Sequence, residues 1–192
     1  MSLHKWTDLR LELSQFCKEN NISENDFRFL GIYEWENVYK NMLKHFVDEM
    51  YARKYGIHWA NIDGGFKKDI NKIYSFQMGV DNNKSYEWIE EFPKLVKDEK
   101  VYLFLEGDDK YWVAECSSAI VQYIVYELAD DYYITDKKFN WLITENHHEI
   151  ITFIGNGIDM EVIKEACQKK KCVTEDEGYV KIYNGTGCRY HE

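Results

Sequence analysis

Residues 101–105, Val-Tyr-Leu-Phe-Leu, and residues 111–114, Tyr-Trp-Val-Ala, are two short runs rich in aromatic and aliphatic side chains. Residues 107–110, Gly-Asp-Asp-Lys, separate the runs and have the composition of a polar turn. Two apolar runs joined by a short polar segment that contains glycine predict a β-hairpin. This hairpin decides the fold class, because upstream of Lys100 the apolar residues recur mainly at helical spacing.

Downstream of the hairpin, strand-like runs alternate with helical patterns. We expect strands at residues 132–135, 139–144 and 150–154, and helices at residues 118–128 and 159–170. The order β-β-α-β-β-β-α is typical of strands joined by hairpins, with helices packed on one face of the sheet. The predicted fold is therefore α+β, with a mostly antiparallel sheet of about five strands.

The N-terminal half is predicted to be helical. Apolar residues recur every three to four positions in residues 7–20 and 34–53, which indicates two amphipathic helices. Residues 67–76 and 85–92 have weaker helical patterns, and Pro93 breaks or bends the second of these.

A single domain is expected for the whole chain. One proline and 11 glycines among 192 residues leave little room for a long flexible linker. The helical half is expected to pack on the sheet. The predicted organisation is one domain over residues 1–192, with a helical part at 1–98 and a sheet-containing part at 99–192.

The formal charge of −10 is concentrated in the later half of the chain. Residues 1–60 and residues 61–100 each have a net charge of −1. Residues 101–192 contain 9 Lys or Arg against 17 Asp or Glu, a net charge of −8. Such a surface repels nucleic acid and anionic lipid, and it attracts basic proteins. The simpler interpretation is a charged surface that only resists aggregation.

The cysteines and the apolar runs predict where the protein resides. The five cysteines are scattered, and five is an odd number. No apolar N-terminal stretch of the kind that directs export is present, and no run of about 18 apolar residues occurs. We therefore expect a cytoplasmic protein with reduced thiols and no membrane contact.

The densest polar cluster is Glu145-Asn146-His147-His148-Glu149. His148-Glu149 begins like the HExxH zinc motif, but Thr152 stands where that motif needs its second histidine. Neighbouring histidines in an extended chain also point to opposite faces. We therefore expect no metal site, although a metal-dependent or hydrolytic enzyme that uses residues 145–149 stays open as the alternative function.

Other catalytic and cofactor motifs are incomplete. No serine lies in a Gly-x-Ser-x-Gly elbow. Cys116 is next to a predicted helix start, where a helix dipole lowers a thiol pKa, but nothing in the sequence places a histidine beside it. The turns Gly155-Asn156-Gly157 and Gly185-Thr186-Gly187 do not continue into a glycine-rich nucleotide motif. We therefore expect no cofactor and no catalytic residue.

Acidic and aromatic side chains form the predicted partner-binding surface. Carboxylates beside aromatic rings are typical of sites that bind basic proteins. The alternative is that the tyrosines of this set lie at the edge of the core. The expected partner-binding residues are Glu106, Asp108, Asp109, Asp130, Asp131, Tyr132, Tyr133, Glu145, Asn146, His147 and His148.

The stretch from Tyr132 to Glu149, together with Tyr111-Trp112 and the segment from Trp35 to Lys40, resembles a family of small uncharacterised bacterial proteins. Some members of that family resemble immunity or antitoxin-type proteins. The resemblance implies a bacterial source and supports an α+β fold. The expected role in masking a basic toxin or another cationic protein rests on the net charge of −8 after Val101 and on the missing catalytic motifs. The resemblance transfers no catalytic residue. The predicted function is thus a non-catalytic protein-binding module with an unidentified basic partner, and its oligomeric state is left open.

Overall fold

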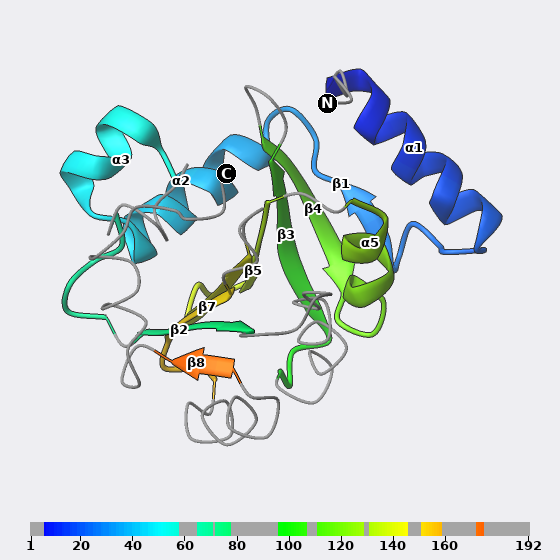
Figure 1. The fold of residues 1–192 in the computed structure, drawn as a ribbon. Helices are drawn as coiled ribbons and strands as arrows, with labels where there is room; N and C mark the ends of the chain where they lie inside the picture. The colour runs from blue at the N-terminus through cyan, green and yellow to red at the C-terminus, as the bar shows by residue number, and fades with distance from the viewer. Residues whose placement is uncertain are drawn as a thin grey trace, which may run out of the picture.

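The structure is a computed structural model that describes residues 6–57, 65–70, 72–77, 96–106, 111–128, 131–145, 151–158 and 172–174. Helices and antiparallel strands are both present, which confirms the predicted α+β class (Figure 1). The described helices are α1 (Trp6–Glu19), α2 (Trp35–Phe46), α3 (Glu49–Tyr55) and α5 (Val121–Leu128). The described strands are β1 (Phe27–Phe29), β2 (Lys72–Gln77), β3 (Lys100–Glu106), β4 (Tyr111–Ser117), β5 (Tyr132–Asp136), β6 (Trp141–Glu145), β7 (Ile151–Gly155) and β8 (Cys172–Thr174).

The described strands form one sheet in the order β1-β4-β3-β5-β6-β7-β2-β8. Every neighbouring pair is antiparallel. The five strands predicted from the sequence are the consecutive central strands from β4 to β7. The sheet is larger than predicted, because β1, β2 and β8 extend it. Two of these strands, β1 and β2, come from the half of the chain that was predicted to be helical.

Strand β2 replaces part of a predicted helix. Residues 67–76 were expected to be helical, but Lys72–Gln77 pairs with β7, and Ile73 lies opposite Phe153. Its sequence, Lys-Ile-Tyr-Ser-Phe-Gln, contains one β-branched and two aromatic residues, which favour strands. Pairing with the sheet therefore decides the conformation, and the helix prediction for this segment is wrong.

A break divides the second predicted helix into α2 and α3. Val47 is extended, with φ −100° and ψ 143°, so the helix cannot continue through it. The Asp48 side chain then accepts hydrogen bonds from the backbone N–H groups of Met50 and Tyr51, at 2.9 and 3.1 Å, and caps α3. The prediction of one helix over residues 34–53 is therefore corrected to two helices.

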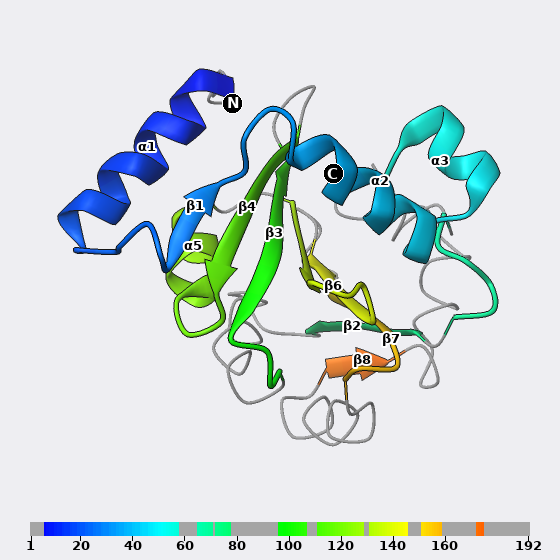
Figure 2. The same ribbon diagram turned by 180° about the vertical axis from the view of Figure 1, so that it is seen from behind.

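Helices cover both faces of the sheet, not one as predicted. Leu103 packs in the hydrophobic cluster that contains Leu13 of α1 and Ile124 of α5, whereas the next residue, Phe104, packs in the cluster that contains Met42 of α2. Figures 1 and 2 show α1 and α5 on one side of β3 and β4, and α2 and α3 on the other. Every residue of β5, β6 and β7 is buried for this reason.

Some predicted elements lie outside the described residues. These are the helices expected at residues 85–92 and 159–170. Among the helices that the structure does describe, none combines the length and the hydrophobicity that crossing a bilayer requires.

Candidate functional site

At one end of the sheet, the strand ends that flank the acidic stretches of the sequence lie next to each other. Glu106 of β3 lies opposite Tyr111 of β4, and Tyr132 of β5 lies opposite Glu145 of β6. Because Leu105 also pairs with Tyr132, all four strand ends are neighbours. We define the acidic end by the ranges 106–111, 129–132 and 145–151. These ranges contain seven Asp or Glu residues against one lysine, a net formal charge of −6.

The predicted aromatic residues of this end are not on the surface. Tyr132, Tyr133 and Glu145 are 3%, 1% and 8% exposed, so the expected exposed aromatic surface is corrected. Two successive tyrosines are both buried because helices or loops cover both faces of β5. Asp131 is half-buried, and for Glu106 the structure gives its strand position. The other predicted partner-binding residues lie outside the described residues: Asp108, Asp109, Asp130, Asn146, His147 and His148.

A buried hydrogen bond fixes the spacing of two strands at the acidic end. The Tyr132 hydroxyl donates to Oε2 of Glu145 across β5 and β6. Burial is the main cause that raises the pKa of Tyr132 well above its ordinary value, and the negative charge of Glu145 adds to it. Tyr132 therefore stays neutral and positions the strand ends instead of contacting a partner.

Two exposed apolar side chains that were missed in the sequence lie beside the acidic end. Ile32 and Tyr33 are 72% and 95% exposed, in the turn between β1 and α2. The turn is attached to β4, because the N–H of Leu30 donates to the Val113 carbonyl at 2.8 Å. An apolar pair directly after Gly31 and outside any periodic run was the signal that could have identified them.

Glu34 stabilises the turn between β1 and α2. Glu34 accepts hydrogen bonds from the Gly31 N–H at 2.9 Å and from the Arg28 guanidinium at 3.2 Å. The Gly31 N–H bond and then the Arg28 bond lower the pKa of Glu34, so its carboxylate stays charged. Both bonds hold the chain in the turn that exposes Ile32 and Tyr33.

The opposite end of the sheet contains a carboxylate surrounded by cations. Glu115 of β4 contacts Lys100 at 3.2 Å, Arg28 at 3.6 Å, and Lys137. Burial alone would raise the pKa of Glu115, but the hydrogen bonds from Lys137 and Lys100 outweigh it, and the net effect lowers the pKa. Glu115 is therefore neutralised inside the chain and contributes little to an external acidic field.

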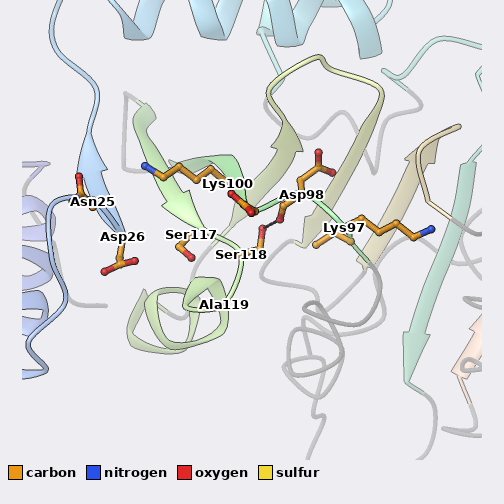
Figure 3. A pocket seen from close by; sticks show the side chains of 10 residues that line it. Asn25, Asp26, Lys97, Asp98, Lys100, Ser117, Ser118 and Ala119 are labelled. Atoms are coloured by element: carbon orange, nitrogen blue, oxygen red, sulfur yellow. Dashed lines mark hydrogen bonds between the residues drawn. The ribbon is translucent and has the colours of Figure 1, made fainter.

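A polar cavity of about 540 Å³ lies at this opposite end, between the start of β1, the segment before β3 and the end of β4 (Figure 3). The Ser118 hydroxyl donates to the backbone oxygen of Asp98, and the Ser117 N–H donates to that of Asp26 at 2.6 Å. The ammonium groups of Lys97 and Lys100 point to opposite sides in Figure 3. The lining thus bonds mainly to itself and does not converge on one point.

A second cavity, of about 340 Å³, lies at the same end near the C-terminus of α2. Its lining combines aromatic, aliphatic, amide and glycine residues. The residues that line it are His45, Phe46, Ile70, Phe139, Asn140, Gly155, Asn156 and Gly157.

The thiols that the structure describes are not activated. Burial raises the pKa of the Cys116 thiol far above its ordinary value, with smaller effects from Cys17 and Asp26. Burial also raises the pKa of Cys17. A thiol that keeps its proton is a poor nucleophile, so the helix start near Cys116 does not activate this residue.

Of the alternative metal or enzyme site at residues 145–149, the structure describes only Glu145. Glu145 is buried and hydrogen-bonded to Tyr132, and residues 146–149 lie outside the described residues. Across the described part of the chain, no group of three or more His, Cys, Asp or Glu residues is arranged to hold a metal ion.

Comparisons with known proteins place the chain in a family. A model described as a family of unknown function (DUF6756) matches residues 5–175, which is most of the chain. No curated protein and no solved structure matches it. The match spans α1 to β8 and so includes the whole described sheet. The chain therefore belongs to the DUF6756 family.

Proposed function

We propose that this chain is a non-catalytic protein-binding module that engages a basic protein through its acidic end. The observation that supports this function is the sheet topology. The three stretches 106–111, 129–132 and 145–151 each begin or end at neighbouring strand ends of β3, β4, β5, β6 and β7. Carboxylates anchored in this way act on the same partner surface, and their summed field speeds encounter with a cation-rich protein.

Ile32 and Tyr33 supply the apolar component of the proposed interface. Charge directs the encounter, but binding free energy comes mainly from apolar and aromatic anchors that lose water on binding. Tyr33 at 95% exposure has its whole ring available for such a contact. In this proposal Tyr33 replaces Tyr132 and Tyr133, whose rings are buried.

The charge of the opposite end orients the partner. Residues 96–100 and 136–140 contain four lysines against three carboxylates, whereas the acidic end has seven carboxylates against one lysine. The carboxylates of Glu115, Asp136 and Glu145 already accept hydrogen bonds within the chain. Among the carboxylates of the acidic end, Glu145 therefore contributes less to the proposed interface.

The specific form of this proposal is an immunity-like protein of the bacterial cytoplasm that masks a basic toxin. The sequence resemblance and the charge distribution support it. A cation-rich active site, such as that of a nuclease, is the surface that such a module would cover, because it must itself be basic to bind phosphates.

The test is a binding titration against cationic nuclease-type domains, starting with the product of the gene next to the one that encodes this chain. We expect saturable binding that weakens as salt concentration rises. Changing Asp108, Asp109, Asp130 and Asp131 to asparagine should weaken it by at least about tenfold. The matched control changes four exposed carboxylates elsewhere, Glu19, Glu24, Glu49 and Asp69, to amides and should leave affinity nearly unchanged. If both quadruple variants bind equally well, or if no domain of the panel binds, the proposal is rejected.

A Tyr33→Ala variant tests the apolar component separately. We expect it to weaken binding through faster dissociation, whereas the aspartate variants mainly slow association. Because Tyr33 is almost fully exposed, its removal should leave thermal stability unchanged. If the complexes of Tyr33→Ala and of wild type dissociate at the same rate, Tyr33 is not part of the interface.

A further inference from the structure

The region around α3 is a basic surface in an otherwise acidic chain. We define the α3 surface by the ranges 44–55 and 65–70, which contain five Lys or Arg residues against three Asp or Glu residues, a net formal charge of +2. The two ranges lie side by side, because the N–H of Asp48 donates to the Gly65 carbonyl at 2.8 Å. Their cations therefore act together on a molecule that approaches α3.

The carboxylates of the α3 surface are mostly engaged within it. Asp48 caps α3, and Glu49 pairs with Arg53. Three exposed lysines of the surface, in contrast, make no ion pair with the described part of the chain. They are Lys44, Lys54 and Lys68. These lysines are available to carboxylates of another molecule.

Exposed apolar side chains accompany the charge on the α3 surface. Met50 is 82% exposed and Tyr55 is 47% exposed. Helix α3 contains no buried residue, and Figures 1 and 2 show it on the outer side of α2, away from β3. Its outward face is therefore open to contact by a second molecule.

The acidic end has the complementary combination of charge and apolar side chains. Its ranges carry a net formal charge of −6, and Ile32 and Tyr33 are exposed beside it. Among the described residues six large hydrophobic side chains are exposed, and four of them belong to these two regions. Opposite charges direct an encounter, and apolar side chains that lose water stabilise the complex. The two regions therefore match each other in both respects.

Helix α2 separates the two regions within one chain. The turn with Ile32 and Tyr33 precedes α2, whereas the α3 surface begins at Lys44 in its last turn. The helix has 12 residues, which corresponds to a length of about 18 Å. A rigid helix of this length keeps Tyr33 away from Lys44 of the same chain, so the matching regions can meet only between two copies.

We propose that the acidic end of one copy docks on the α3 surface of a second copy. Lys44, Lys54 and Lys68 face the carboxylates of the acidic end, and Tyr33 contacts Met50. The contact joins two different surfaces and is therefore head-to-tail. It occupies the acidic end, so a basic protein partner would displace the second copy. This last consequence rests on the proposed function, whereas the contact between copies does not.

The test is sedimentation velocity of the full chain alone, at about 0.15 M salt, where repulsion between whole chains is largely screened. We expect the average mass to rise with protein concentration between about 10 μM and about 1 mM, the range in which weak contacts dissociate. The triple variant Lys44→Glu, Lys54→Glu, Lys68→Glu should weaken this association by at least about tenfold.

The matched control changes three exposed lysines outside the α3 surface. Lys18→Glu, Lys97→Glu, Lys138→Glu alters the net charge by the same amount and should leave the association nearly unchanged. Met50→Ser should weaken the association, whereas Leu11→Ser, which removes an apolar side chain that is 68% exposed on α1, should not.

A charge exchange separates the contact from effects on folding. A second triple variant, Asp108→Lys, Asp109→Lys, Asp130→Lys, reverses the acidic end and should also fail to associate by itself. An equimolar mixture of the two α3-surface and acidic-end triple variants should associate again, because each reversed surface meets a surface of opposite charge.

Three results would overturn the proposal. They are a wild-type chain that stays monomeric over the whole concentration range, equal association by the two lysine triple variants, and a mixture of the charge-reversed variants that does not associate. The titration against basic domains decides the proposed function separately, because it measures binding to a different protein.

Discussion

Thr144 of β6 and Thr152 of β7 lie directly opposite each other in the sheet, and each hydroxyl is buried without a hydrogen-bond partner among the described residues. A buried hydroxyl that makes no hydrogen bond loses its hydration without compensation. Valine has nearly the same shape as threonine and carries no polar atom. The pair is therefore a place where two substitutions that remove polarity should increase stability.

We expect Thr144→Val and Thr152→Val each to raise the free energy of unfolding by about 1 kcal/mol in urea denaturation. The matched control is Thr135→Val, because Thr135 is equally buried but its hydroxyl donates to the Trp141 carbonyl at 2.6 Å. That control should lower stability by about 1 kcal/mol. If Thr144→Val and Thr152→Val lower stability as Thr135→Val does, both threonine hydroxyls have hydrogen-bond partners outside the described residues, in protein or in water.

Alkaline pH should weaken the fold through Tyr132. Its pKa is raised in the folded state by burial and by Glu145, so the folded chain keeps a proton that the unfolded chain releases above about pH 10. The stabilisation is complete below the unfolded pKa and is lost as pH rises from there through the folded pKa. We expect the free energy of unfolding to fall by up to about 1.4 kcal/mol per pH unit from this group.

Urea denaturation between about pH 8 and pH 11 measures this slope. The double variant Tyr132→Phe, Glu145→Gln removes both the titrating hydroxyl and the charge beside it, so its slope should be smaller by the same amount. Identical slopes in the variant and the wild type would mean that Tyr132 does not titrate differently in the two states.

Glu115→Gln should destabilise the chain at neutral pH by about 1 kcal/mol. The side chain is 11% exposed, but its cationic partners are about 40% exposed, so solvent screening keeps the loss small. The pKa of Glu115 is lowered, so its contribution is present above the ordinary carboxyl pKa and is lost as pH falls through the folded value. The difference from wild type should therefore begin to shrink as pH falls below the ordinary carboxyl pKa, and it should disappear below the lowered pKa of Glu115 in the folded chain.

Glu36→Gln is the control for Glu115. It removes the exposed helix pair with Lys40, whose side chains are 56% and 73% exposed, and should change stability by less than about 0.5 kcal/mol. Thermal or urea denaturation at several pH values checks both variants. A loss for Glu115→Gln that persists in acid would point to altered packing and not to charge.

Gly155→Ala should be among the most destabilising alanine substitutions in the described chain. Gly155 has φ +101°, and an added Cβ would meet the backbone oxygen of Asn140 and lie 2.9 Å from Cα of Trp141. Backbone atoms cannot move away cheaply, so we expect a loss of about 3 kcal/mol or more. Gly31→Ala, where the added atom meets the Glu34 side chain at 3.3 Å, should cost less than about 1 kcal/mol.

The sequence predicted the central strands because each is a short, continuous run of β-formers between polar turns. The hairpin of β3 and β4 is the clearest case, since Val101 to Leu105 and Tyr111 to Ala114 pair as expected. Strand β1 has three residues, too few for a periodic pattern, and β2 is stabilised by pairing with β7 from the distant half of the chain. Local propensity cannot reveal partners of that kind.

The sequence predicted the negative charge of the acidic end, but it did not predict which side chains there are exposed. The acidic stretches are visible in the sequence, but their convergence follows from the strand order. Tyr132 and Tyr133 looked like surface residues because the sheet was expected to have one open face. The second cavity joins His45, Phe139 and Asn156 from three distant segments, and a left-handed phenylalanine has no signature in sequence.

The outermost strands of the sheet, β1 and β8, contain three residues each. Strands this short expose few unpaired backbone groups, so they give a second molecule little template on which to add a strand. Behind them lie β4, with seven residues, and β2, with six. A truncation that removed either short strand would uncover a longer strand with more unpaired backbone groups, and resistance to aggregation would fall before the core itself was disturbed.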